Sequence, residues 1–425
     1  MMISLVLILI GQFVWAEDWP GWRGPRGDGA SHEIHVPVQW SLSANQNIAW
    51  KTEVPGEGHA SPIVWQDHVF LLTCDLTTQE RLLLDFDRVS GKLRWQRSVL
   101  TSPLETKHAL NSYASSTPAT DGKLVYVTFL KSDNKTILAT NVSTPRDVTL
   151  GTMVVAAYDL EGNLIWMKEP GEFVSVHGFC TCPVLYQDLV ILNGDHDGKS
   201  YMVALKKDNG SEVWRVARKH GIRSYVTPIV RRFEDREQLI LSGDQSVMSY
   251  NPQTGDVLWQ MEGPTEQFVA SMVDDGKRVF LTAGYPDKHL LAIDPTGTGD
   301  VTSTHVVWRS NRNCAYVPSP IICESYLVMV SDDGIASCYD SATGERLWNA
   351  RLGGKYSTSP VTANGLVYFT SDDGLTKVIR PGKTLEIVSE NALGEPCSAS
   401  PAISQGSFFI RTKHHLIRID EMKAK

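Results

Sequence analysis

Short stretches of alternating apolar and polar residues recur along the whole chain. Residues 124–129 and 366–370 show this alternation, and so do residues 154–158 and 290–293. A period of two residues predicts β-strands that turn one face towards a core. Asp-Gly pairs, which favour tight hairpin turns, stand between such strands. These pairs are at residues 197–198, 333–334 and 373–374.

The strands belong to a longer repeat, which begins with a hydroxyl residue before proline and closes with Thr-Gly and a tryptophan. One copy runs from Ser319-Pro320 to Trp348, and another runs from Thr227-Pro228 to Trp259. Repeats of about four strands predict a β-propeller, because one such unit cannot bury both of its faces alone. We call the first residue of each copy its anchor. The anchors are Ser61, Thr117, Cys182, Thr227, Ser271 (followed by Met272 in place of proline), Ser319, Ser359 and Ser400.

The closing tryptophan predicts how the ring is held together. In the seventh copy its position falls at Glu386, and the eighth copy ends near Asp420 with no room for a last strand. Residues 47–52, at the other end of the chain, resemble the missing strand. We therefore expect an all-β, eight-bladed β-propeller of four-stranded blades, closed by an N-terminal strand that removes the open sheet edges. The tryptophans, expected to pack between blades, are Trp95, Trp166, Trp214, Trp259, Trp308 and Trp348.

The first sixteen residues have the pattern of a secretory signal peptide. An apolar run, Ile3–Ile10, is followed by the small-residue cleavage pattern Val14-Trp15-Ala16. The run is shorter than the ~20 residues of a membrane-spanning helix. We expect an exported protein, periplasmic or secreted, with no transmembrane segment. Its expected divisions are a signal peptide (1–16), an irregular N-terminal lead (17–46) and a single propeller (47–425).

Composition narrows the range of partners. The 425 residues carry a formal net charge of −8 and no long basic run, which argues against a nucleic-acid partner. Seven cysteines are an odd number, so at least one stays unpaired within the chain. No Cys-x-x-Cys-His motif occurs, which excludes covalent c-type haem. We expect a monomer.

The repeat ending carries a family likeness. It reads Tyr-Asn-Pro-Gln-Thr-Gly-Asp-Val-Leu-Trp at residues 250–259 and Ala-Ile-Asp-Pro-Thr-Gly at residues 292–297. This phrase resembles the tryptophan-docking repeat of the pyrroloquinoline quinone (PQQ)-like propellers. The opening Trp-Pro-Gly-Trp-Arg-Gly-Pro-Arg-Gly-Asp-Gly at residues 19–29 is similar to the lead-in of secreted members. That superfamily includes quinoprotein alcohol dehydrogenases and the lipoprotein scaffold of outer-membrane protein assembly.

The resemblance to the enzymes of that superfamily implies a particular catalytic site. It comprises a bound quinone, a calcium ion held by Glu and Asn, a catalytic Asp and a disulfide between adjacent cysteines. No two cysteines are adjacent here, and the nearest substitute is Cys180-Thr181-Cys182. No set of Glu, Asn and Asp can be matched position by position. We expect binding without a cofactor. The alternative is a PQQ- and calcium-dependent oxidoreductase acting on alcohols or sugars.

The loops that enter each blade share one face of a propeller with the hairpins between second and third strands. Aromatic residues recur near the same offset in seven of the eight entry loops. Such a ring packs between blades or surrounds the mouth of a funnel that holds a flat or acidic ligand. On the second reading, the funnel face binds a protein, peptide or glycan. Its expected ligand-binding residues are His59, Tyr113, His177, Arg223, Tyr225, Tyr316, Lys355 and Tyr356.

Two further features fall on the same face. A polar insertion at residues 131–152 divides the second and third strands of the second repeat, and loops of this length are often functional. His177, Cys180 and Cys182 lie within six residues of one another and could bind zinc or copper, although no fourth ligand is evident. Free or paired thiols explain the two cysteines more simply.

Overall fold

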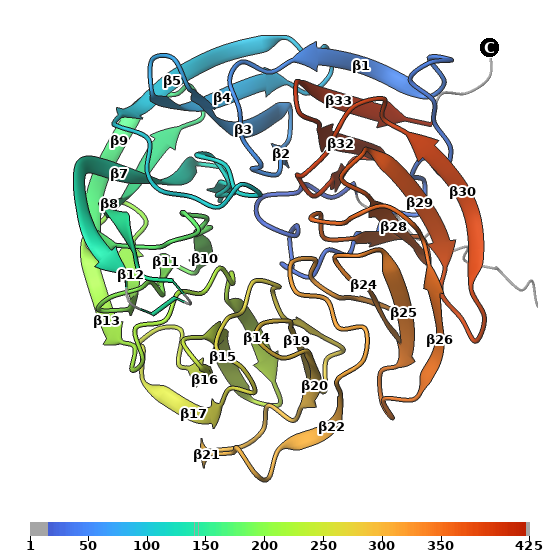
Figure 1. Cartoon of the computed structure of the whole chain (residues 1–425). Coiled ribbons are helices and arrows are strands. Elements are labelled where there is room, and N and C mark those ends of the chain that lie inside the picture. Colours follow the sequence, from blue (N-terminus) through green and yellow to red (C-terminus); the bar gives the residue numbers. More distant parts are fainter. Residues whose placement is uncertain (1–15, 140, 143, 422–425) are drawn as a thin grey trace, which may run out of the picture.

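Eight four-stranded blades form a circle in the computed structural model (Figure 1). The circle encloses a cavity, and we call this central space the channel. The structure describes residues 16–139, 141–142 and 144–421, so nearly all of the predicted signal peptide lies outside the described residues. In the described part of the chain every regular element is a β-strand, and no helix there could cross a membrane. The predicted all-β, eight-bladed propeller is confirmed.

The first four blades follow one another along the chain and are numbered in that order. Blade 1 contains β2 (Ile63–Trp65), β3 (His68–Asp75), β4 (Glu80–Asp87) and β5 (Leu93–Thr101). Blade 2 contains β6 (Ala119–Thr120), β7 (Leu124–Ala139), β8 (Arg146–Asp159) and β9 (Leu164–Phe173). Blade 3 contains β10 (Val184–Tyr186), β11 (Leu189–Gly194), β12 (Tyr201–Lys206) and β13 (Glu212–Ala217). Blade 4 contains β14 (Ile229–Phe233), β15 (Arg236–Gly243), β16 (Ser246–Tyr250) and β17 (Val257–Glu262).

The remaining blades complete the circle. Blade 5 contains β18 (Val273–Asp274), β19 (Val279–Ala283), β20 (His289–Ile293) and β22 (Val306–Ser310). Blade 6 contains β23 (Ile321–Cys323), β24 (Tyr326–Val330), β25 (Ile335–Asp340) and β26 (Arg346–Arg351). Blade 7 contains β27 (Val361–Ala363), β28 (Leu366–Thr370), β29 (Leu375–Arg380) and β30 (Glu386–Ala392). Blade 8 contains β31 (Ala402–Ser404), β32 (Ser407–Arg411), β33 (His415–Asp420) and β1 (Ile48–Glu53).

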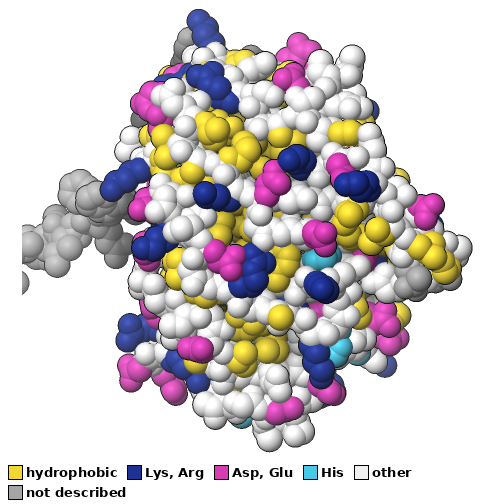
Figure 2. Space-filling model, turned by 90° about the vertical axis from the view of Figure 1, so that its left-hand side faces the viewer, with side chains coloured by type: hydrophobic (Ala, Val, Ile, Leu, Met, Phe, Trp, Pro, Cys, Tyr) yellow, Lys and Arg dark blue, Asp and Glu magenta, His cyan; other side chains and the backbone are white. Residues whose placement is uncertain are grey.

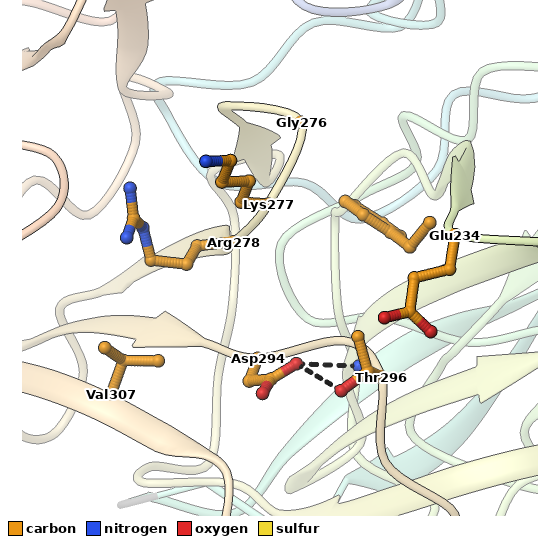
Figure 3. Close-up of a pocket in the computed structure, with 8 residues that line it drawn as sticks. Glu234, Gly276, Lys277, Arg278, Asp294, Thr296 and Val307 are labelled. Atoms are coloured by element: carbon orange, nitrogen blue, oxygen red, sulfur yellow. Dashed lines mark hydrogen bonds between the residues drawn. The ribbon is translucent and has the colours of Figure 1, made fainter.

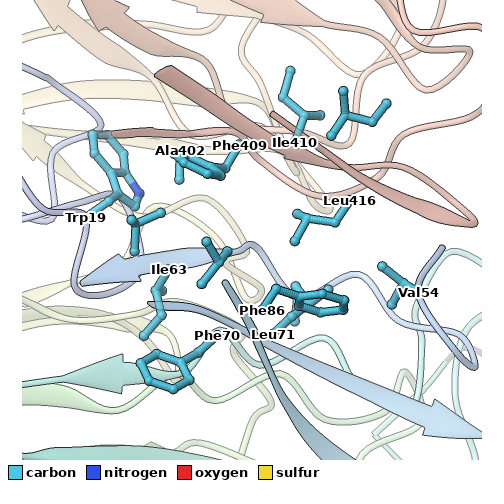
Figure 4. Packing of buried hydrophobic residues seen from close by; sticks show 14 of the residues in the cluster. Trp19, Val54, Ile63, Phe70, Leu71, Phe86, Ala402, Phe409, Ile410 and Leu416 are labelled. Carbon is cyan, nitrogen blue, oxygen red and sulfur yellow. The ribbon is translucent and has the colours of Figure 1, made fainter. Parts of the chain in front are cut away.

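Blade 8 is built from both ends of the described chain. Strand β1 pairs antiparallel with β33, in a register that places Glu53 opposite His415 and Ile48 opposite Ile419. The outer strand of this sheet therefore comes from residues that precede blade 1 in the sequence. Side chains of blades 8 and 1 pack together in one buried cluster, which also contains Trp19 (Figure 4).

The closing tryptophans join each blade to the next, as the repeat pattern predicts. Five of the six, together with Trp50 of β1, donate the indole N–H to a backbone carbonyl oxygen of the following blade. In five of these six contacts a turn glycine of that blade lies against the indole ring: a Cβ at Gly344, whose φ is 74°, would come within 2.5 Å of Trp308. Glycine is therefore required there for the backbone conformation and for the close approach. The bonds join Trp50 to Arg88, Trp95 to Leu160, Trp166 to Lys207, Trp214 to Pro252, Trp308 to Ser341 and Trp348 to Gly382, at 2.7–3.2 Å.

Trp259 is the exception, and a glutamine takes over its contact with the next blade. Its indole N–H donates to Oε1 of Gln238 within blade 4, at 2.7 Å. The amide Nε2 of Gln238 in turn donates to the carbonyl oxygen of Pro295 in blade 5, at 2.9 Å. The short strand β21 (Gly299–Asp300) also pairs in parallel with β17 at this junction. The junction between blades 4 and 5 is therefore held through a relay.

The anchors surround the channel, and hydrogen bonds join five of their eight neighbouring pairs; we call this arrangement the ring. The backbone N–H of Ser319 donates to the hydroxyl oxygen of Ser359, the anchor of the next blade, at 3.0 Å. The residue before proline supplies the N–H, because proline itself has none to donate. The same residue supplies the acceptor for the preceding blade, which explains why it carries a hydroxyl. Cys182 takes the same position with its Sγ. The bonds of the ring run from Ser61 to Thr117, Thr117 to Cys182, Ser271 to Ser319, Ser319 to Ser359 and Ser359 to Ser400, at 2.9–3.2 Å.

The N-terminal lead crosses the centre of the ring and bonds to many blades along its path (dark blue in Figure 1). Trp19 pairs with Val64 of blade 1, and the indole N–H of Trp22 donates to the anchor of blade 5. Further along, the carboxylate of Glu33 accepts backbone N–H groups of blade 8. Trp40 packs on Phe408, with ring centroids 5.6 Å apart, beside the blade that lacks a closing tryptophan. The lead thus lies across the channel just below the anchors.

The polar insertion of blade 2 is a continuation of two strands. Strands β7 and β8 remain paired as far as Ala139 and Arg146, so the segment expected as a long loop is largely an extended hairpin. Val148 of this hairpin is fully buried in a small cluster with Val174 and Val176. This packing directs the far end of the hairpin to the mouth of the channel, where Asn141 contacts blade 3.

Candidate functional site

A cavity of about 990 Å³ occupies the centre of the propeller. Entry loops and the tip of the blade 2 hairpin form its mouth, several anchors form its waist, and Trp22 of the lead lies at its floor. Five of the eight residues predicted to bind a ligand line the cavity. They are His59, His177, Arg223, Tyr225 and Tyr316.

A group of aromatic and imidazole rings covers the wall next to blades 2, 3 and 4. His177 contacts His108 edge-to-face at 5.5 Å between ring centroids and Tyr225 at 6.0 Å. The hydroxyl of Tyr225 is within 2.8 Å of Ser175 Oγ, which holds the ring in place. Burial, assisted by the charge of Arg223, lowers the pKa of His177 to about 4. The wall therefore presents a neutral imidazole at pH 7.

His59 lies on the blade 1 side of the cavity in a similar state. Burial and the positive charges of Arg411 and Lys107 lower its pKa to about 4. Its backbone N–H donates to Ser112 Oγ at 2.9 Å. Both predicted histidines are thus neutral near pH 7.

Arg223 reaches the cavity as one half of a buried ion pair. Its Nη1 lies 2.8 Å from Oδ1 of Asp197, and both side chains are almost completely buried. The amide of Asn141 donates to the same carboxylate oxygen at 2.8 Å, which ties the blade 2 hairpin to blades 3 and 4. Asp197 was expected only to form a turn. Its carboxylate also neutralises Arg223, so this predicted ligand-binding arginine does not present a free positive charge to the cavity.

Tyr316 stands on the opposite wall. Its hydroxyl donates to Oε1 of Gln267 at 3.2 Å, and its ring contacts Tyr285 at 6.5 Å. Asp332, in the hairpin between β24 and β25, accepts the backbone N–H groups of Tyr316 and Val317. A hairpin acid of the same blade therefore holds the entry loop, as expected if the two share one face.

The other three predicted residues do not line the cavity. The ring of Tyr113 lies beneath two cations, Arg81 at 5.6 Å and Lys107 at 5.1 Å. Tyr356 is buried in the core between blades 6 and 7, where it meets Phe369 edge-to-face. Lys355 is exposed to solvent. Entry-loop residues at the same sequence offset therefore point in different directions, because loop lengths differ between blades.

Several residues of the cavity wall were not predicted from the sequence. Trp22 comes from the lead, and Asn141 and Arg146 come from the hairpin of blade 2. The serine anchors were noted as markers of the repeat, although their side chains also line the cavity. A recurring hydroxyl at the innermost position of each blade was the signal that could have revealed them.

A second, smaller cavity of about 400 Å³ lies between the turns of blades 4 and 5 (Figure 3). Two of the four charged residues that line it, Asp294 and Arg278, are engaged locally. Asp294 accepts the backbone N–H and the hydroxyl of Thr296, at 2.9 and 2.7 Å. Arg278 pairs with Asp275 at 2.6 Å. Glu234 and Lys277 complete the charged lining, from blades 4 and 5.

The thiols near the central cavity are held as neutral side chains. Cys182 Sγ accepts the N–H of Thr117, and Cys180 Sγ lies 3.8 Å from the carbonyl oxygen of Tyr225. Burial raises the pKa of both thiols. Each of the seven cysteines, all within the described residues, is free. No three His, Cys, Asp or Glu side chains of the described residues are grouped so that they could hold a metal ion.

The carboxylates of the cavity do not fit the calcium ion of the related enzymes. Two carboxylates line the wall, those of Glu266 and Asp332. Asp332 is already committed to two backbone N–H groups, and Glu266 is exposed at the rim. These side chains do not assemble an oxygen cage of the kind that calcium prefers.

The comparisons with known proteins agree with this architecture. The sequence profile of the family described as outer membrane protein assembly factor BamB matches residues 39–146, 132–308 and 287–384. The chain belongs to this family. It is a PQQ-like repeat propeller related both to BamB and to quinoprotein dehydrogenases. No curated protein matches the sequence.

Solved structures resemble this family member in fold. BamB from Moraxella catarrhalis superposes with a TM-score of 0.61 at 14% identity, over 88% of this chain and 99% of that chain. Quinohemoprotein alcohol dehydrogenase from Comamonas testosteroni superposes with a TM-score of 0.65 at 12% identity, over 96% of this chain and 81% of that chain. At identities this low, the superposition shows the fold alone. The function has to be inferred from the residues of the site.

Proposed function

We propose that this protein is an exported binding propeller whose funnel face binds a segment of a protein or peptide partner. The observation that carries the proposal is the central cavity, which has a floor formed by the lead and a mouth formed by loops and a hairpin. A cavity of about 990 Å³ lies at the upper end of the usual range for small-molecule sites, and so has room for several amino-acid side chains.

Apolar side chains near the mouth support a protein ligand. Leu110, which lines the cavity, is 66% exposed, and Leu138 on the blade 2 hairpin is 59% exposed. A protein partner would bury both side chains, and apolar groups rimmed by polar residues are a feature of protein-binding sites. The flank of the molecule carries positive and negative side chains interspersed with one another (Figure 2), without the single-sign patch that a nucleic acid would need. The family description, an outer membrane protein assembly factor, supports the same reading and an exported location.

Peptide selection tests the proposal. Peptides are selected from a displayed random library on the purified protein, and the dissociation constants of synthetic copies are measured. We expect Leu110→Glu and Leu138→Glu to weaken binding at least tenfold. Val89→Glu is the matched control, since Val89 is equally exposed but lies in the turn between β4 and β5 on the opposite face. Failure to enrich any peptide, or equal weakening by all three variants, would refute a peptide-binding funnel.

A further inference from the structure

Four serine anchors at the waist of the cavity have hydroxyl hydrogens without an acceptor. Each serine oxygen accepts one N–H: Ser271 from the indole of Trp22, and the next three from the preceding anchor. Within the described residues none of the four donates its own O–H to a protein oxygen, although all are between 1% and 7% exposed. Buried donors without partners are costly, so a ligand that accepts from them is favoured. The four are Ser271, Ser319, Ser359 and Ser400.

The position of these hydroxyls makes them one set. All four line the same cavity, on consecutive blades 5 to 8, at the same place in the repeat. The ring bonds hold each serine oxygen in place, so the remaining rotation of the O–H can follow a ligand. Hydroxyl donors that converge in this way suit an oxygen acceptor, and most of all a charged one, since hydrogen bonds to an anion are the stronger kind.

Two buried arginines, which lie behind the cavity wall and do not line it, add positive charge near the channel. Arg23, beside Trp22 in the floor, donates to the carbonyl oxygen of Pro320, the residue after the anchor Ser319, at 2.9 Å. Arg411 lies under Gly58, next to His59, and donates to the carbonyl oxygen of Leu72.

Among the described residues neither arginine forms an ion pair, and each retains at least one buried N–H without a partner. The nearest acids that act on them, Asp28 and Glu57, lie beyond ion-pair distance. Burial lowers the pKa of Arg23 to about 10 and that of Arg411 to about 9, which shows that both charges lack full compensation.

We propose that the serine ring is a carboxylate-binding subsite, which receives an acidic side chain or the C-terminal carboxylate of the segment bound in the funnel. The proposal rests on the proposed function for its ligand, and on the four free hydroxyls and the two unpaired arginines for its chemistry. Glu266 and Asp332 do not oppose it at the waist, because one is at the exposed rim and the other is bound to backbone N–H groups.

Thermal unfolding with small probes tests the subsite apart from any peptide. Succinate is compared with its neutral diamide, succinamide, at matched ionic strength. A ligand that binds only the folded state raises Tm. We expect succinate to raise the Tm of the wild-type protein and succinamide to leave it unchanged. Equal shifts with both probes, or no shift with succinate, would overturn the proposal without the need for any variant.

Substitutions locate the effect. Ser319→Ala and Ser359→Ala should each weaken succinate binding at least tenfold. Thr117→Val is the matched control, because it removes an equivalent ring bond from an anchor that does not line the cavity. Equal weakening in the control would show that ring stability, and not a binding hydroxyl, is at stake, and this would also overturn the proposal.

Selected peptides separate the two proposals. Peptides with a free C-terminus are compared with C-terminally amidated copies and with copies in which Glu and Asp are replaced by Gln and Asn. Loss of affinity on one of these changes supports the subsite and identifies the source of the carboxylate. Peptides that bind equally well in all forms would overturn the subsite and leave the funnel function intact. Succinate binding without any peptide binding would instead support the subsite and refute the peptide-binding funnel.

Discussion

The indole N–H of Trp22 donates to the hydroxyl oxygen of Ser271 at 3.0 Å, although 249 residues separate the two in the sequence. The bond joins the N-terminal lead to the anchor of blade 5. It holds the Trp22 side chain at the floor of the channel. The eight blades by themselves do not provide this floor. A segment outside the repeats thereby becomes part of the cavity.

Replacement of Trp22 should affect both stability and binding. In Trp22→Ala the half-buried ring and its hydrogen bond are lost, and we expect a decrease of about 1–3 kcal/mol in the free energy of unfolding. Trp22→Phe keeps an aromatic floor and should lose about 1 kcal/mol or less. Denaturant titrations of the two variants measure the difference. Unchanged stability and peptide affinity in Trp22→Ala would mean that the floor is dispensable.

The relay through Gln238 gives a second prediction. Gln238→Leu removes the acceptor of the buried Trp259 N–H and one of two donors to the Pro295 carbonyl oxygen, which keeps its bond from Arg236. A buried group left without a partner costs about 1–3 kcal/mol, and we expect a loss of that size. Gln253→Leu, an exposed glutamine of the same blade, is the control. Hydrogen exchange should show faster opening at the junction of blades 4 and 5 in the first variant only.

The thiols should be unreactive in the folded protein. Burial raises the pKa of Cys74 to about 11 and the pKa values of Cys314, Cys338 and Cys397 to about 12. The thiolate is the reactive form, so alkylation by iodoacetamide at pH 8 should be orders of magnitude slower than in denaturant. Mass spectrometry counts the alkylated sites. A thiol that reacts as fast in the folded as in the unfolded chain would contradict the buried environment of that residue.

Stability should depend on pH through His59 and His177. Their pKa values are about 4 in the folded protein, against an ordinary value of 6.5. Between these values the unfolded chain binds protons that the folded chain does not. The contribution of the two histidines to the free energy of unfolding is therefore constant above pH 6.5 and falls as the pH decreases towards 4. After allowance for solvent screening, the two histidines should account for about 1–3 kcal/mol of this decrease.

Substitution tests whether the two histidines cause this dependence of stability on pH. In the double variant His59→Gln, His177→Gln the free energy of unfolding should change less between pH 6.5 and 4 than in the wild type. The exposed His414→Gln variant is the control and should follow the wild-type curve. Identical slopes in all three proteins would show that other groups are responsible.

The architecture could be predicted because its signals are local and repeated. The spacing of anchor, strands, Thr-Gly turn and tryptophan follows from the needs of one blade and its neighbour, and each need recurs at the same sequence offset. The anchor must present an acceptor to the preceding anchor, as Ser359 does to Ser319. The glycine must admit the tryptophan of the preceding blade, as Gly344 admits Trp308.

The site could be predicted only in part, for the opposite reason. Whether an entry-loop side chain faces the cavity depends on the length of its loop and on partners from other blades. His177 and Tyr225 reach the wall, whereas Tyr356, at a similar offset, is buried between blades. Asp197, which belongs to the preceding blade, neutralises the charge of Arg223.

By itself, therefore, the sequence determined the repeat, the eight blades and the tryptophan contacts, because these depend on periodicity and on residues close in the chain. Only the tertiary structure decided that the lead forms a floor, that the blade 2 insertion is a hairpin directed to the mouth, and which polar groups remain without partners. Those features depend on contacts between distant segments, where burial and the nearest opposite charge set the state of each side chain.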